Sequence, residues 1–99
     1  MERYHTRNGI VLTSICGEYV LISAAALRDQ VPYLTQITES SAFLWRLLES
    51  GADEQELERA VLEEYEIEDP AQARSAIRAF VQQMLRGGYL LKEGENEHE

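Results

Sequence analysis

Partway along the chain, the spacing of apolar positions changes from runs typical of β-strands to a helical period. Residues 10–15 and 18–23 are both rich in β-branched and apolar side chains, and Cys16 and Gly17 lie between them. Gly17 can adopt the positive φ that a tight turn requires. The two runs therefore predict a β-hairpin.

A third apolar run, residues 32–37, predicts a further strand in the same sheet. Pro32 has no N–H to donate to a ladder, so it is expected at the start of this strand or on a free edge. Between the hairpin and this strand, residues 24–31 include three alanines, which favour a helix. That segment is short, however, and we expect a loop.

After Thr38 the apolar positions follow a helical period. Residues 42–48 are apolar on nearly every side of a helix, a pattern typical of a central, buried helix. Either Thr38 or Ser40 is suited to cap its first turn. Ser50 and Gly51 mark its end.

A second helix is predicted to start at Asp53. Glu56 follows three residues later, so the pair forms a variant of the capping box with aspartate at the N-cap. Acidic side chains fill most of the remaining surface of this helix. Its apolar stripe consists of Leu57, Ala60, Val61 and Tyr65.

The third helix has the clearest start signal. Asp69 is a natural N-cap, and Pro70 fits the first helical position. Gly87 is suited to the left-handed position that ends the helix, and residues 89–91 then predict a short strand or wing. The apolar positions at helical spacing are Ala73, Ile77, Phe80, Val81, Met84 and Leu85.

Together these elements predict an α+β fold, with a three-stranded antiparallel sheet followed by three helices of winged helix-turn-helix type. The 99 residues make one small domain. We expect this domain to span residues 10–92, with a flexible N-terminus at 1–9 and an acidic, disordered tail at 93–99.

The formal net charge of −9 is distributed unevenly. Residues 53–69 carry nine acidic side chains, whereas residues 70–92 carry four basic side chains and no acidic one. The overall balance argues against a general binder of nucleic acid or anionic membranes, since such surfaces need excess lysine and arginine. The basic segment is a candidate contact surface.

The sequence offers little for catalysis or metal binding. His5 and His98 lie near the two ends, and Cys16 is the single cysteine, so no internal disulfide is expected. Neither a metal-ligand spacing nor a nucleophile–histidine pair can be assembled. We therefore expect a non-enzyme with no cofactor or metal. No apolar run has the length of a signal peptide core or a membrane span, so we expect a cytoplasmic protein.

Two stretches resemble the PqqD-like proteins, also called RiPP recognition elements after the ribosomally synthesised and post-translationally modified peptides. GEYVLI at residues 17–22 is similar to the family's "GEYVLV" strand. LTQITESSAFLWRLL at residues 34–48 is similar to its strand running into an "LNETGAFLWELL" helix, and MLRGGYL at residues 84–90 fits as well. Thr38 and Ser41 stand where the family often has Asn and Gly, which leaves open the peptide that is bound.

The resemblance implies a non-catalytic peptide chaperone. A precursor's leader peptide would add as a further strand to the edge of the third strand, in a groove beside the third helix. The protein would then present the precursor to a modifying enzyme, often a radical S-adenosylmethionine (SAM) enzyme. The peptide-binding residues expected on this basis are Tyr33, Leu34, Thr35, Gln36, Ile37, Arg74, Ile77, Arg78, Val81 and Leu85.

Three alternatives stay open at this stage. Arg74 and Arg78 project from one face of the third helix, where they could pair either with acidic leader side chains or with the acidic second helix. The basic third helix also allows a DNA-binding winged helix as the runner-up function. Finally, the strand edge could serve a protein partner or a second copy, so a monomer or a weak dimer is expected.

Overall fold

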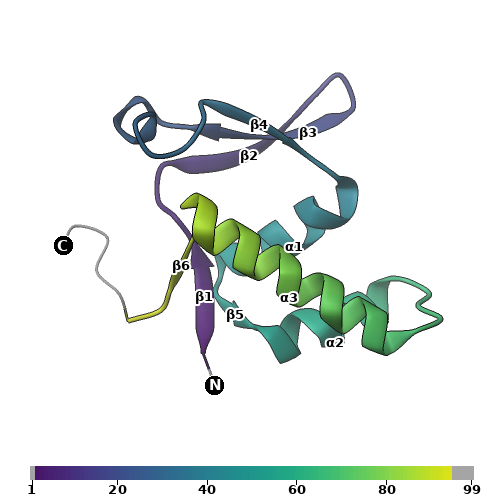
Figure 1. Ribbon diagram of the computed structural model, residues 1–99. Helices are drawn as coiled ribbons and strands as arrows, with labels where there is room; N and C mark the ends of the chain where they lie inside the picture. The colour runs from purple at the N-terminus through teal and green to yellow at the C-terminus, as the bar shows by residue number, and fades with distance from the viewer. Residues whose placement is uncertain (1, 95–99) are drawn as a thin grey trace.

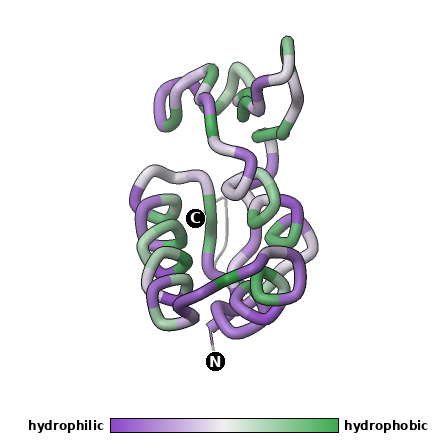
Figure 2. The backbone as a smooth tube through the Cα atoms, turned by 90° about the vertical axis from the view of Figure 1, so that its right-hand side faces the viewer, coloured by the Kyte–Doolittle hydropathy of each residue, from purple (hydrophilic) through white to green (hydrophobic). Residues whose placement is uncertain are grey.

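The computed structural model describes residues 2–94, which form two layers (Figure 1). One layer is an antiparallel sheet in the order β2–β3–β4, and the other combines three helices with a second antiparallel sheet in the order β5–β1–β6. Figure 2 shows the two layers one above the other. The elements are β1 (Arg3–Thr6), β2 (Ile10–Ile15), β3 (Glu18–Ser23), β4 (Leu34–Ile37), α1 (Glu39–Glu49), β5 (Ala52–Asp53), α2 (Glu54–Glu64), α3 (Pro70–Gly87) and β6 (Leu90–Lys92). The predicted α+β class with a three-stranded sheet and three helices is confirmed.

The predicted hairpin is confirmed, and its turn has two residues. Cys16 has a φ of 52° and Gly17 a φ of 80°, and Ile15 pairs with Glu18 across the turn. Two consecutive positive φ angles are typical of a type I′ turn, whose twist matches that of the flanking strands. The turn therefore fixes the register of β2 on β3.

The third strand of this sheet starts later than the sequence predicts. β4 begins at Leu34, and Pro32 and Tyr33 precede it as irregular backbone in which the Tyr33 carbonyl accepts a hydrogen bond from the Ser23 N–H at the end of β3. The preceding segment, expected to be a loop, contains one turn of 3₁₀ helix at Ala25–Leu27. Val31, which follows this turn, is buried and so ties the segment to the core.

The second sheet is an element that the sequence analysis missed. Residues 1–9 were expected to be flexible, yet β1 lies between β5 and β6. Tyr4 is 4% exposed and joins the core, whereas Arg3, His5 and Thr6 are only partly buried. A four-residue strand with one buried apolar side chain has too little alternation to be recognised from the sequence.

The predicted helix starts are confirmed by their capping bonds. Thr38 Oγ1 accepts a hydrogen bond from the Ser41 N–H at 3.1 Å, which identifies Thr38 as the cap of α1. At the start of α2, Asp53 and Glu56 each accept a hydrogen bond from the other's backbone N–H, at 2.8 and 2.9 Å. Asp69 caps α3.

The end of α3 lies one residue later than predicted. Gly87 is the last helical residue, and Gly88 adopts the left-handed conformation with a φ of 86°. The Tyr89 N–H donates to the Met84 carbonyl at 2.9 Å, and the Gly88 N–H donates to Leu85 at 3.2 Å. This pair of bonds is a Schellman motif, which places the left-handed residue at Gly88.

The core lies between the two layers, with α1 at its centre. Trp45 and Leu48 of α1 have no exposed surface, and Leu21 of β3 reaches the same cluster from the upper sheet. Tyr4 and Leu90 contribute from the second sheet. The prediction of a central, buried first helix is confirmed.

The predicted acidic tail, residues 93–99, falls largely outside the described residues. Within the described residues, the Glu93 N–H donates to the Arg3 carbonyl at 2.9 Å. The backbone therefore stays hydrogen-bonded to β1 as far as Glu93. Among the helices of residues 2–94, none is long and apolar enough to cross a membrane.

Candidate functional site

Within residues 2–94, β4 pairs with β3 on one side and has no strand partner on the other. β3 and β4 are antiparallel, with Ile22 opposite Leu34 and Val20 opposite Gln36. A strand edge of this kind carries unpaired N–H and C=O groups. β4 is therefore the candidate edge for strand addition.

The alternation of hydrogen bonds along β4 shows which backbone groups point away from β3, towards the free edge. The Ser23 N–H donates to the Tyr33 carbonyl at 2.9 Å, so Tyr33 directs its polar groups towards β3. In an antiparallel pair this direction alternates with every residue. Thr35 and Ile37 therefore face β3, and the N–H and C=O groups of Leu34 and Gln36 face the free edge.

The side chains of the five expected edge residues divide between the two faces of the sheet. Tyr33 is 52% exposed, with the Arg28 guanidinium 4.3 Å from its ring centroid, and Leu34 is 47% exposed. Thr35 and Ile37 are half-buried on the inner face, where Ile37 packs against the core. Gln36 is exposed on the outer face.

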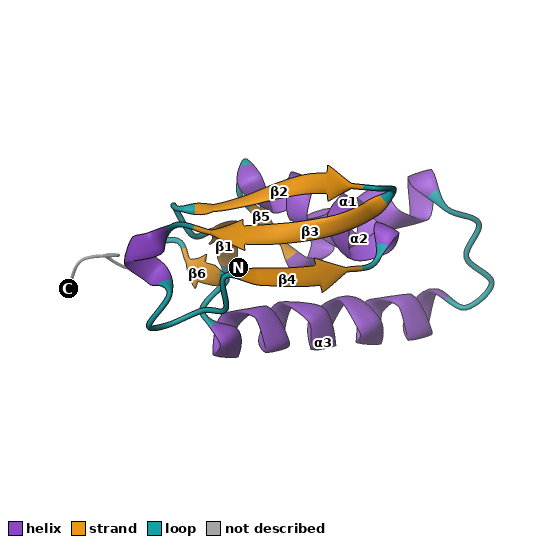
Figure 3. Cartoon of the chain, turned by 90° about the horizontal axis from the view of Figure 1, so that it is seen from above, coloured by secondary structure: helices purple, strands orange, loops and turns teal. Residues whose placement is uncertain are grey.

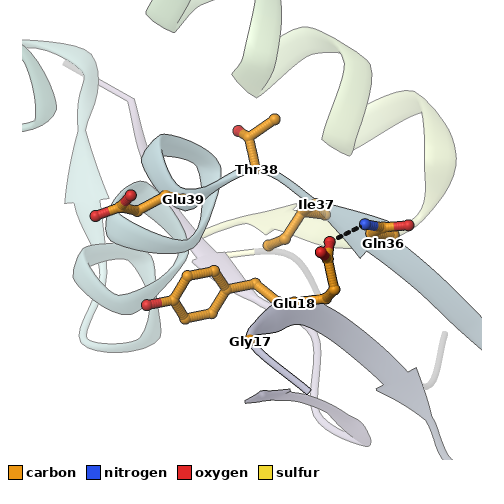
Figure 4. Close-up of a pocket in the computed structure, with 7 residues that line it drawn as sticks. Gly17, Glu18, Gln36, Ile37, Thr38 and Glu39 are labelled. Carbon is orange, nitrogen blue, oxygen red and sulfur yellow. Dashed lines mark hydrogen bonds between the residues drawn. The ribbon is translucent and has the colours of Figure 1, made fainter. Parts of the chain in front are cut away.

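A shallow pocket of about 450 Å³ lies where β4 ends and α1 begins (Figure 4). Across it, the Gln36 side-chain amide donates a hydrogen bond to the Glu18 carboxylate. Glu39, in the first turn of α1, adds a second carboxylate to the rim. The end of the candidate edge is therefore acidic.

On α3, both arginines pair with the acidic second helix. Arg74 donates two hydrogen bonds to Glu58, both 3.1 Å long, and Arg78 donates one to Glu54 at 3.2 Å. The hydrogen bond with Glu58, reinforced by its charge, raises the pKa of Arg74. Both arginines thus lie on the flank of α3 that faces α2.

The other expected residues of α3 are mostly interior. Ile77 is 4% exposed and Val81 has no exposed surface, so both support the helix from within. Leu85 is half-buried and packs against the core. Ile77 nevertheless lines a pocket between α3, α1 and α2.

The cavity-lining flank of α3 includes Ile77 from the expected site, but the sequence analysis did not assign its other residues. Ala73, Ala76 and Phe80 border a mostly apolar pocket of about 460 Å³ between α3, the start of α1 and the end of α2. We call it the helical pocket. The signal that could have indicated this flank is a pair of small residues, Ala73 and Ala76, two turns and one turn before the half-buried Phe80.

No group of three or more metal-ligating side chains lies together within residues 2–94. Cys16 is exposed in the hairpin turn.

Comparisons with known proteins agree with this fold. A family model described as "Coenzyme PQQ synthesis protein D (PqqD)" matches residues 18–90. A solved structure described as "Lasso peptide synthetase B1 complexed with the leader peptide" is similar with a TM-score of 0.69 at 19% identity, covering 89% of this chain and 96% of its own. Another, "TbiB1 in Complex with the TbiA(beta) Leader Peptide", has a TM-score of 0.69 at 22% identity, covering 94% and 99%. No curated protein matches the chain.

Proposed function

The chain belongs to the PqqD family, and from this premise we propose that it binds the leader of a ribosomally made precursor peptide by strand addition to β4. The free edge of β4 is the observation that carries the proposal. The two structural neighbours are described as complexes with leader peptides, which supports the same function for this fold.

The outward backbone groups of β4 define how a peptide would pair. Leu34 and Gln36 each offer one N–H and one C=O, so an added strand can form four backbone hydrogen bonds with them. Pro32 lies two residues before Leu34 and has no N–H to offer an added strand. It therefore limits pairing at the start of β4. The peptide register would be centred on Leu34 and Gln36.

Backbone pairing alone gives only modest affinity. Each hydrogen bond contributes about 0.5–1.5 kcal/mol net. Ordering a flexible peptide costs about 2–5 kcal/mol, and association costs more. Anchored side chains must supply the remaining free energy, so the leader should carry apolar residues that contact the protein beside β4.

In this proposal the protein is a non-catalytic adaptor that presents the bound precursor to a separate modifying enzyme. The family resemblance implies that this enzyme is often a radical SAM enzyme, and that class stays a prediction. A cytoplasmic location and a monomer or weak dimer stay predictions as well.

DNA binding, the alternative considered from the sequence, is not favoured. A recognition helix needs cationic or amide side chains free to reach phosphates and bases. Arg74 and Arg78 are instead paired with Glu58 and Glu54. These carboxylates would also repel a nucleic-acid backbone.

The proposal can be tested with peptides selected from a displayed library of random 20-residue sequences. We expect selected peptides to shift the backbone amide signals of Leu34 and Gln36 in isotope-labelled protein. A scan of N-methyl groups along one such peptide should then lower affinity at alternate positions, because only every second N–H faces β4. Uniform tolerance of N-methylation would refute strand addition.

A pair of variants tests the protein side of the same contact. Gln36→Pro removes an outward N–H and leaves the inward bonds of Thr35 and Ile37 in place, so it should abolish peptide pairing while the sheet still forms. Gln36→Ala, which keeps that N–H, is the matched control and should retain binding. Equal affinity in both variants would contradict the proposed register.

A further inference from the structure

The helical pocket lies directly beyond the end of the candidate binding edge. Ser40 and Ser41, in the first turn of α1, form its rim next to Thr38, which follows β4. Figure 3 shows β4 running into α1. The remaining walls are largely apolar and come from Leu44, Val61, Tyr65, Ile67, Ala76 and Phe80.

The size and lining of this pocket suit a large apolar side chain. Its volume of about 460 Å³ falls within the range of roughly 300–1,000 Å³ typical of ligand sites. Tyr65, one wall, packs edge-on against Phe43 with ring centroids 5.5 Å apart, which fixes its orientation. An aromatic side chain entering the pocket would meet ring edges and methyl groups, with two serine hydroxyls at the mouth.

A shallow groove of about 480 Å³ continues from the pocket along the start of α3. Both concavities share the wall formed by Glu66, Ile67, Ala73 and Ala76, so they form one connected surface. Glu68 and Asp69 line the groove further along.

The groove is negatively charged. Glu66 and Glu68 are exposed, and neither forms an ion pair within residues 2–94. Asp69 accepts the first N–H groups of α3, so the positive end of that helix is already compensated. The nearest cation of α3, Arg74, is held on the opposite flank by Glu58.

Two carboxylates outside the groove, Glu39 and Glu64, also act on Tyr65 in the wall of the pocket. Burial raises the pKa of Tyr65, and the negative charges of Glu39 and Glu64 raise it further. The mouth of the pocket therefore favours positive charge on a bound ligand.

We propose that the helical pocket seats an aromatic or long aliphatic side chain of the same peptide that pairs with β4, and that the groove beyond it takes an adjacent lysine or arginine. This inference rests on the proposed function. A strand advances about 3.3 Å per residue, so a peptide leaving β4 at Ile37 passes Ser40 and reaches the pocket within roughly three to five residues. The class of ligand is thus an extended peptide with an apolar anchor and a basic neighbour outside the paired segment.

The inference is tested with the library-selected peptides described above. Ala76 is exposed and lines both concavities, so Ala76→Phe should fill the entrance with little effect on the core. We expect it to weaken peptide binding at least tenfold. Ala79→Phe adds the same ring at an exposed position of α3 outside the two cavities, and it should leave the dissociation constant within about twofold.

The charge preference needs a second pair of variants. The double variant Glu66→Gln, Glu68→Gln should weaken binding of a lysine-containing peptide about three- to tenfold at low salt. Its effect should vanish when that lysine is replaced by norleucine. The double variant Glu49→Gln, Glu63→Gln changes the net charge equally on α1 and α2, away from the groove, and should have little effect.

The possible outcomes separate this inference from the proposed function. If the N-methyl scan shows pairing with β4 but Ala76→Phe binds like the wild type, the pocket assignment is overturned and strand addition stands. If the scan shows no alternation, strand addition itself fails. Should Ala76→Phe not fold, replacing the peptide's aromatic or aliphatic anchor with alanine in the wild-type complex supplies the same readout.

Discussion

Thr35 Oγ1 in β4 lies 2.6 Å from the hydroxyl oxygen of Tyr89, which follows the end of α3. This contact joins the candidate binding strand of the upper sheet to the helical layer. Tyr89 is 9% exposed, and its ring also lies beside the backbone of Gly87. The hydrogen bond therefore helps to hold the free edge of β4 at a fixed position relative to α3.

Tyr89→Phe should lower the free energy of unfolding by about 0.5–1.5 kcal/mol, since it removes one hydroxyl and keeps the ring. Urea unfolding, followed by the fluorescence of the buried Trp45, measures this change. Thr35→Val is the partner variant. If the double variant loses as much as the sum of the two single changes, the two hydroxyls do not interact.

The paired arginines of α3 make a second prediction. Replacing Arg74 and Arg78 together with alanine should leave the dissociation constant for a selected peptide within about twofold, because both side chains are bound to α2 and lie away from the helical pocket. Titration calorimetry at matched salt provides the measurement. A tenfold loss would show instead that these side chains reach the peptide.

Sequence reasoning succeeded where the signals were local. The hairpin turn at Cys16 and Gly17 and the capping pair Asp53 and Glu56 each depend on residues within four positions of one another. Turn and cap geometry is set at that range, so the sequence alone specified these features.

Sequence reasoning failed where contacts between distant segments of the chain decide the structure. Arg3 in β1 donates to Glu56 Oε1 at 2.6 Å and to the Gly51 carbonyl at 3.0 Å, contacts that join segments about fifty positions apart. For α3, the apolar stripe identified the buried face. Which of its two flanks borders a cavity depends on where α2 lies, and that placement has no local signal. The partners of Arg74 and Arg78, left open by the sequence, are likewise carboxylates of α2, Glu58 and Glu54.

The hairpin turn provides a third prediction. Cys16 adopts a φ of 52°, a left-handed conformation that costs most residues free energy and that asparagine tolerates well. Cys16→Asn should therefore raise the free energy of unfolding by about 0.5–2 kcal/mol. Cys16→Val, with a β-branched side chain at the same φ, should lower it. Equal stability of the two variants would argue against the type I′ turn.

The titration of Tyr4 gives the last prediction. Burial raises the pKa of Tyr4, and the charges of Glu2 and Glu54 raise it further. The fold thus favours the neutral phenol. The raised pKa stabilises the folded state fully at pH values below the unfolded pKa of about 10. This stabilisation is lost as the pH rises through the native pKa. Stability should consequently fall between about pH 10 and the pH at which native Tyr4 ionises.

Tyr4→Phe removes this ionisation and should flatten the alkaline loss of stability, measured as the urea midpoint at pH 9 and pH 11. The pKa of Tyr65 is raised in the same direction, so its ionisation leaves a residual slope. The double variant Tyr4→Phe, Tyr65→Phe should remove that slope as well. If Tyr4→Phe loses as much stability as the wild type, ionisation of this buried tyrosine is not the cause of the alkaline transition.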